Sequence, residues 1–237
     1  MTTGPTSPGP TPPARRHRRW LPSALALVLA CAGVPTPSIA APEAATAVDT
    51  AWILARIARP APSRTPFVEL RGSPLLKQPL RVEGVYRRPD AGTLVREVRA
   101  PYTERTTIRA GEVAIERAGK STRRFPLSRA PELEGLQSSF AALLSGDAER
   151  LQRRFEVRSE GRRDGWRLHL APRDPALAAR LRGLVLHGRG AELRCIETRP
   201  TGDGAIQRTL LAGAAQAAGA QADATALAAI CRGDAHG

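Results

Sequence analysis

The sequence predicts an α+β protein built mainly from antiparallel β-strands. Three observations lead to this class. Short segments in which apolar and polar residues alternate recur along most of the chain, and turn residues separate them. Residues 132–154 change to the spacing of an amphipathic helix. A second apolar helix pattern stands at residues 46–59, so the strands are expected to form a sheet around a cavity that helices close.

The first half of the chain is expected to form one helix and six strands. The helix spans residues 46–59 and ends at Pro60. The next segment alternates, which places Phe67 and Glu69 on the same side of a strand. The other five strands are expected near residues 80–88, 93–99, 105–110, 112–117 and 121–125.

The second half is expected to continue with helices and then with a second group of strands. Asp147 follows a break in the helical pattern and can cap a short second helix. Strands are predicted at 155–161 and 164–172, and a short helix from Asp174 to Gly183. Three more strands are expected between residues 184 and 211, followed by an Ala-rich tail with a loose helix near 222–231.

The charge of the chain is strongly positive and comes almost entirely from arginine. There are 36 Lys+Arg against 22 Asp+Glu, a formal net charge of +14, and the lysines are Lys77 and Lys120 alone. Abundant Arg and Ala are typical of proteins from GC-rich genomes, which is one source of this charge; a nucleic-acid partner is the other. Aromatic residues are only 4% of the chain, and basic charge without interleaved aromatics is a weak nucleic-acid pattern. No nucleic-acid partner is therefore expected.

The N-terminus predicts export to the periplasm. Residues 1–13 are rich in Pro, Thr and Gly and are expected to be disordered. A basic "ARRHRRW" segment, a short apolar run and "SIA" before Ala41 then follow the pattern of a cleaved secretory signal over residues 1–40. The alternative is a lipobox, in which "VLAC" would make Cys31 a lipidated new N-terminus.

Two cysteines, Cys195 and Cys231, remain beyond the signal segment. An even number of cysteines in an oxidising compartment predicts a disulfide between them, and two separate buried thiols are the alternative. A helix in the Ala-rich tail would bring Cys231 toward the sheet.

The sequence contains no pattern of an enzyme or of a metal or cofactor site. It has no Gly-x-Ser-x-Gly, HExxH, CxxC or phosphate-binding glycine loop. His169 is expected on the outer side of a strand and His187 at a turn, both exposed to solvent. We therefore expect no catalytic residue, no cofactor and no metal, and the protein is not predicted to be an enzyme.

The order of several short motifs resembles the LolA-like periplasmic lipoprotein carriers, especially their divergent branch. A strand runs to Arg88-Pro89, and the next strand ends near "APYTE". A helical "ALLSGD" then precedes "RRFEV" and "GWRLHLAPRD". The resemblance implies an incomplete, strongly curved β-barrel with a helical lid over an apolar cavity. It covers the predicted carrier domain at residues 41–212, before the Ala-rich tail at 213–237.

In that family an arginine before the proline reaches into the cavity and holds the lid. Arg88 matches this position, and by strand alternation three residues share its side. The resemblance thus implies a lipid cavity and lid latch formed by Arg88, Val82, Gly84, Tyr86, Phe67, Leu94, Phe140, Leu143 and Leu144. In the other interpretation, Arg87 and Arg88 are ordinary surface arginines at a strand edge.

The function implied is that of a monomeric carrier for the acyl chains of a lipoprotein or another acylated lipid. It would take cargo from an inner-membrane donor complex and deliver it toward an outer-membrane acceptor. The alternative is a periplasmic interaction or sensor module of the same fold, anchored through a lipid on Cys31. A hydrolase without a recognisable motif is the third possibility.

Overall fold

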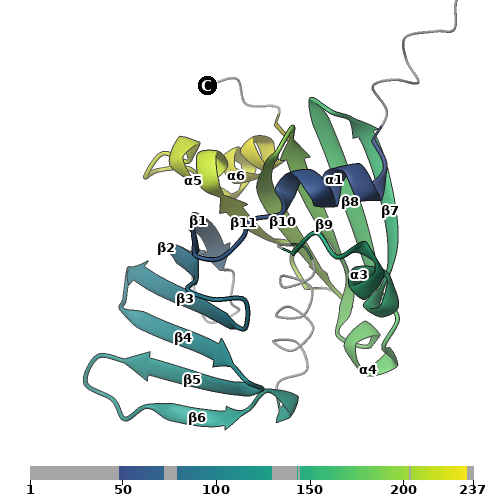
Figure 1. The fold of residues 1–237 in the computed structure, drawn as a ribbon. Coiled ribbons are helices and arrows are strands. Elements are labelled where there is room, and N and C mark those ends of the chain that lie inside the picture. The colour runs from purple at the N-terminus through teal and green to yellow at the C-terminus, as the bar shows by residue number, and fades with distance from the viewer. Residues whose placement is uncertain (1–47, 72–78, 130–142, 144, 203, 234–237) are drawn as a thin grey trace, which may run out of the picture. The chain divides into compact units, whose positions relative to one another are not determined.

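The computed structural model describes residues 48–71, 79–129, 143, 145–202 and 204–233. Eleven strands in this part of the chain form one antiparallel sheet (Figure 1). Their bounds are β1 Ser63–Arg71, β2 Leu80–Arg88, β3 Thr93–Ala100, β4 Glu104–Arg109, β5 Glu112–Arg117, β6 Arg123–Pro126, β7 Phe155–Arg162, β8 Gly165–Pro172, β9 Leu181–Arg189, β10 Glu192–Pro200 and β11 Gln207–Leu211.

The strand order shows that the sheet is open. It runs β6-β5-β4-β3-β2-β1-β11-β10-β9-β8-β7, so the first and last strands of the chain pair at the centre. The pairing of β1 with β11 joins two meanders, which we call the first arm (β1–β6) and the second arm (β7–β11). The edge strands β6 and β7 do not pair with each other. The predicted class, a mainly antiparallel sheet forming an incomplete barrel, is confirmed.

The helices of the described residues lie on both faces of the sheet. They are α1 Thr50–Ile57, α3 Ala148–Arg154, α4 Pro175–Ala178, α5 Ala212–Ala217 and α6 Ala224–Arg232, with a 3-10 turn at Leu127–Arg129. Asp49, Asp147, Asp174 and Asp223 cap α1, α3, α4 and α6, and each carboxylate accepts a backbone N–H of the first turn.

The alternation within the strands separates two cores. The inner face of the sheet carries Phe67, Val82 and Trp166, which belong to the main apolar cluster. The outer face carries Val68, Cys195 and Leu210, which form a second cluster with residues of α5 and α6. Because side chains in a strand alternate between faces, a single sheet supports a core on each side.

Most predicted elements are present within one or two residues of their expected bounds. The turn at Ala110-Gly111 joins β4 to β5, and both residues have positive φ, 51° and 76°, as a type I′ hairpin requires. The predicted helix 46–59 is α1, and the tail helix is α6.

Two expectations in the second half were wrong. The helix begun by Asp174 ends at Ala178, and Gly183 lies inside β9 rather than beyond a helix. His187 also lies inside β9 and is buried, not exposed at a turn. Leu184 and Leu186, two residues apart, both pack in the inner core, a spacing that fits a strand and not a helix.

Residues 1–47 and 130–142, Leu144 and the last four residues lie outside the described residues. The predictions about the signal segment, Cys31, Phe140, Leu144 and most of the helical lid fall there. Within the described ranges, no helix has both the length and the apolar character needed to cross a bilayer.

Candidate functional site

The inner face presents apolar side chains from both arms of the sheet. Alternate residues of the paired strands supply them, and the cross-strand register places them side by side. The buried members on the strands are Phe67, Val82, Val98, Phe155, Trp166, Leu168, Leu170, Leu181, Leu184, Leu186, Ile196 and Leu211. Ile108 and Val113 extend apolar character toward the free edge of the first arm. Such a face is the kind of surface that an acyl chain requires.

Two close ring contacts explain glycines on this face. Gly84 lies opposite Phe67, and a Cβ at Gly84 would come within 1.9 Å of the Glu97 carbonyl oxygen on β3 and within 2.7 Å of the Phe67 ring. Gly188 lies opposite Trp166, where a Cβ would come within 2.0 Å of the indole. Each aromatic ring therefore occupies space that a side chain on the neighbouring strand would fill. Gly84, a predicted site residue, therefore leaves room for the Phe67 ring on the inner face.

Helix α1 covers part of the inner face (Figure 1). Ile53, Leu54 and Ile57 recur at helical spacing and are at most 3% exposed in the main cluster. Leu143, which lies in the predicted lid segment, is also buried in this cluster. Covering elements therefore pack against part of the apolar face in this structure.

Arg88 connects the first arm to the segment that follows α1. It is the last residue of β2, is 8% exposed, and its guanidinium Nη1 donates to the backbone carbonyl of Arg59 at 2.8 Å. Arg87 faces the other way: its Nε lies 3.0 Å from the Glu97 carboxylate, and its side chain is 40% exposed. The two neighbouring arginines therefore occupy different environments on opposite faces of β2.

A small pocket of about 80 Å³ lies beside the Arg88 contact. Arg88, Tyr86 and Leu94 line it from the first arm, with Ile57 and Leu211 among the residues on the opposite side. Since a water molecule occupies about 30 Å³ in the liquid, the pocket offers far less space than a long acyl chain needs. An acyl chain can therefore enter only if covering residues move.

The predicted cavity residues are thus distributed in three ways. Arg88, Tyr86 and Leu94 line the rim pocket. Phe67, Val82 and Leu143 are buried in the inner core, and Gly84 lies beneath Phe67. Phe140 and Leu144 lie outside the described residues.

A polar cluster interrupts the inner face and was not identified from the sequence. Glu69 is 1% exposed and accepts hydrogen bonds from Arg71 Nε at 2.7 Å, Thr209 Oγ1 at 3.2 Å and Gln207 Nε2 at 3.3 Å. Arg96 Nη2 also donates to Glu69, and its guanidinium lies 4.6 Å from the centre of the Phe67 ring. The available sequence signal was a glutamate on the same strand face as Phe67.

Burial raises the pKa of the Tyr86 hydroxyl, although the charge of nearby Arg96 acts in the opposite direction. Tyr86 therefore remains neutral at physiological pH and can share an otherwise apolar pocket. Its ring packs against Phe67, with the ring centres 4.8 Å apart.

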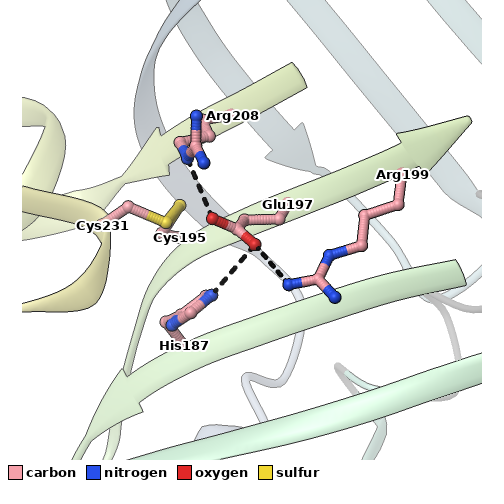
Figure 2. The surroundings of a disulfide bond; sticks show 6 residues. All are labelled: His187, Cys195, Glu197, Arg199, Arg208 and Cys231. Carbon is pink, nitrogen blue, oxygen red and sulfur yellow. Dashed lines mark hydrogen bonds and ion pairs between the residues drawn. A yellow bond between two sulfur atoms is a disulfide. The ribbon is translucent and has the colours of Figure 1, made fainter. Parts of the chain in front are cut away.

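The outer face holds the predicted disulfide. Cys195 of β10 and Cys231 of α6 are joined, and both are at most 1% exposed (Figure 2). Around them, Val68, Leu210 and Leu227 are among the apolar residues that attach α6 and α5 to the sheet. The tail therefore belongs to a packed core and is covalently tied to it.

We expect the loss of this disulfide to lower stability. The bond closes a loop of 36 residues, which limits the unfolded chain and contributes roughly 3–4 kcal/mol on the chain-entropy model. Urea unfolding of the Cys195→Ser/Cys231→Ser variant should show that loss at an unchanged β-sheet signal. A variant as stable as the oxidised wild type would show that apolar packing alone holds the tail.

A charge cluster stands next to the disulfide, around Glu197 (Figure 2). Glu197 is 4% exposed; Arg199 Nη2 donates to it at 3.0 Å and Arg208 Nε at 2.9 Å. His187 Nε2 lies 3.7 Å from the same carboxylate. The His187 imidazole and the two guanidiniums hold the pKa of the Glu197 carboxyl well below its usual range.

The same cluster brings together three metal-ligand types. Donor atoms of His187, Glu197 and Cys231 lie within 4.8 Å of one another. In the oxidised protein the Cys231 sulfur is bonded to Cys195 and supplies no thiolate, which is the form that binds metal. The arrangement in this structure therefore fits an ion-pair cluster better than a metal centre.

The depressed pKa of Glu197 makes its contribution to stability pH-dependent. The stabilisation is fully present above the pKa of the unfolded carboxyl, near 4.5, and is lost as pH falls toward the lower folded value. Glu197→Gln should therefore cost on the order of 3 kcal/mol at pH 7, and the deficit should shrink as the pH is lowered below 4.5. Unfolding curves at a series of pH values test this. Glu156→Gln, an exposed change on β7, should have little effect at any pH.

A family model described as outer membrane lipoprotein carrier protein LolA-like matches residues 40–235. The chain therefore belongs to this family of LolA-like proteins, and the match includes most of the Ala-rich tail. Among solved structures, the chain is similar to the crystal structure of a LolA superfamily protein from Nitrosomonas europaea. The sequence identity is 12%, the alignment covers 70% of this chain and 92% of that chain, and the TM-score is 0.39. Comparison with curated proteins finds no match.

Proposed function

We propose that this protein is a periplasmic carrier, not an enzyme, that shields the acyl chains of a lipoprotein or another acylated lipid. In this proposal the protein works as a monomer, receives its cargo from an inner-membrane donor and delivers it toward an outer-membrane acceptor. Membership of the LolA-like family and the predicted signal segment support this assignment.

The observation that carries the proposal is the apolar inner face with a cover attached at its rim. Both arms of the sheet contribute large apolar side chains to one surface, and α1 closes part of it. Each acyl methylene exposed to water costs about 0.8 kcal/mol. A chain of about sixteen carbons thus costs roughly 12 kcal/mol in water, so it needs shielding to cross an aqueous compartment.

Release of the cargo requires a competing state, and the closed structure supplies one. When no lipid is bound, the apolar face packs against α1, and the Arg88 guanidinium donates to the Arg59 carbonyl. A hydrogen bond from a charged group contributes about 1.5–3 kcal/mol. Cargo must displace these contacts, so the affinity for lipid is lower than the full transfer energy of its chains.

The decisive experiment identifies lipid that copurifies with the protein. The full-length gene is expressed, the protein is purified from the cell envelope, and bound lipid is extracted and identified by mass spectrometry. We expect acyl-containing molecules in a fixed ratio to the protein. A Tyr86→Glu variant, which places a charge in the rim pocket, should lose them.

Arg87→Glu is the matched control, because it also adds negative charge to β2 but on the outer face. It should retain bound lipid. If folded wild-type protein carries no lipid and takes up no fluorescent fatty acyl probe, the carrier function is wrong. An intact mass that shows a diacylglycerol adduct on Cys31 would instead favour the anchored interaction module.

A further inference from the structure

A second pocket, separate from the rim pocket, lies beside the disulfide where β8 and β9 meet the end of α6. Its volume is about 200 Å³, and most of its lining is polar. Four arginines line it, together with His187: Arg167, Arg189, Arg194 and Arg232. Among its described lining residues, Asp164 is the one carboxylate. The pocket therefore concentrates positive charge.

Local backbone features place several of these side chains. Arg194 lies at an irregularity between Leu193 and Cys195 of β10, where the register with β9 shifts. Such bulges redirect a side chain relative to regular alternation. Arg189 ends β9, and its Nε donates to the Asp164 carbonyl at 3.1 Å, which holds the side chain near the turn between β7 and β8.

Two buried donor positions at the pocket lack a hydrogen-bond partner. His187 is more than nine-tenths buried, and its Nε2 makes no hydrogen bond; the nearest carboxylate oxygen, on Glu197, is 3.7 Å away. The Nε atom of Arg194 is also buried without a hydrogen bond. Buried polar atoms in native proteins nearly always have a partner. His187 Nε2 is directed at the Glu197 carboxylate, so the Arg194 Nε is the buried donor that indicates a ligand able to accept a hydrogen bond.

The existing ion pairs leave capacity for an anion. Arg167 Nη1 lies 3.1 Å from Glu160, and Arg194 Nη1 lies 3.7 Å from Glu192. Each guanidinium has five N–H groups, so one carboxylate contact does not occupy it. At the end of α6, the Gly233 N–H donates to the carbonyls of Ala229 and Ile230, which satisfies two carbonyl acceptors of the last helical turn.

From this geometry we propose that the pocket is a binding site for a tetrahedral oxyanion of the phosphate type. Guanidinium groups match phosphate oxygens in charge and in planar, two-point geometry. The volume accommodates one phosphate group with a few waters. The phosphate can be free in solution or belong to a lipid head group at a membrane surface. This site is independent of the inner apolar face and of the carrier function.

The disulfide connects this site to the redox state of the protein. Cys231 and Arg232 are consecutive residues at the end of α6, and both line the pocket. The bond between Cys231 and Cys195 holds this turn against β10. Without it, the position of Arg232 in the pocket is less constrained, so phosphate binding should weaken.

The test measures binding of inorganic phosphate to protein purified from cells that express the full chain, by titration calorimetry at fixed ionic strength. A double variant, Arg194→Gln/Arg232→Gln, should bind at least tenfold more weakly than wild type. Arg158→Gln, which removes an exposed arginine on β7 outside the pocket, should bind as wild type does. Circular dichroism and thermal unfolding confirm that each variant is folded.

A second experiment distinguishes the two possible sources of the phosphate group. Flotation with vesicles of phosphatidylcholine, with or without one-fifth phosphatidic acid, reports whether a lipid head group is bound. If the protein binds phosphate and floats equally with both kinds of vesicle, the site is assigned to free phosphate. If wild type floats selectively with vesicles that contain phosphatidic acid and the double variant does not, the site is assigned to a lipid head group. If the double variant and Arg158→Gln have the same affinity for phosphate and the same retention on phosphatidic acid vesicles, the proposal is overturned.

Discussion

Arg88→Leu is expected to leave the protein folded and to stop it from passing lipid to an acceptor. The side chain ends β2 at the rim, so its removal opens no cavity in the core. The variant loses the hydrogen bond to the Arg59 carbonyl, which contributes about 1.5–3 kcal/mol to the closed state. That loss shifts the opening equilibrium by roughly 10- to 150-fold, because every 1.4 kcal/mol is a factor of ten.

A more open protein takes up an acyl chain more readily and returns less readily to the empty closed state. Uptake of an environment-sensitive fluorescent lipid should therefore persist or increase, whereas transfer to acceptor vesicles should fall by at least tenfold. Circular dichroism checks the fold. The matched control is Arg87→Leu, which removes the neighbouring guanidinium from the outer face. Equal uptake and transfer in the two variants would show that Arg88 is only part of a basic surface.

Glu69→Leu is expected to destabilise the protein more than any other change considered for the inner face. The carboxylate is 1% exposed and neutralises Arg96, whose side chain is 14% exposed. Removing one partner of a buried ion pair leaves the other charge uncompensated, which costs roughly 3–5 kcal/mol. Urea unfolding measures this change directly.

The double variant Glu69→Leu/Arg96→Leu distinguishes charge compensation from simple loss of packing. It should lose less stability than the sum of the two single variants, because neither charge remains buried alone. Glu83→Leu on β2 is the control: Glu83 pairs with Arg81 but its side chain is 45% exposed, so the cost should stay near 1 kcal/mol or below. Additive losses at Glu69 and Arg96 would contradict the coupling.

The inner face contains a buried ion pair as well as the apolar side chains that the carrier proposal requires. A surface built only for acyl chains needs no charge, yet the first arm has the Glu69–Arg96 pair directly beside Phe67. The pair links β1 to β3 across β2, while Thr209 and Gln207 extend it to β11. It thus spans the junction of the two arms, where the first and last strands of the chain pair.

The strand pattern and turn residues could be predicted from the sequence because both are local. Alternation at Val113 and Ile115, the Ala110-Gly111 turn and the Arg88-Pro89 end of β2 depend on residues within a few positions of one another. The pairing of Cys195 with Cys231 was also predictable, since the predicted removal of residues 1–40 leaves two cysteines with no other partner. The family resemblance came from the order of these local motifs, and the family match confirms it.

Other features depended on contacts between residues far apart in the chain. The pairing of β1 with β11 brings Glu69 to Thr209, and the pairing of β9 with β10 turns His187 from an expected surface residue into a buried neighbour of Glu197. A short segment of sequence shows that apolar and polar residues alternate, but it does not show which strand will pair with it.

By itself, then, the sequence determined the antiparallel class, most strand and turn positions and the alternating faces of those strands, because backbone geometry sets these within a few residues. Only the tertiary structure decided which strands became neighbours, that Arg88 reaches the Arg59 carbonyl, and that four arginines line one pocket together with His187. The physical reason is that long-range pairing depends on the combined packing of the whole sheet. No short segment contains that information.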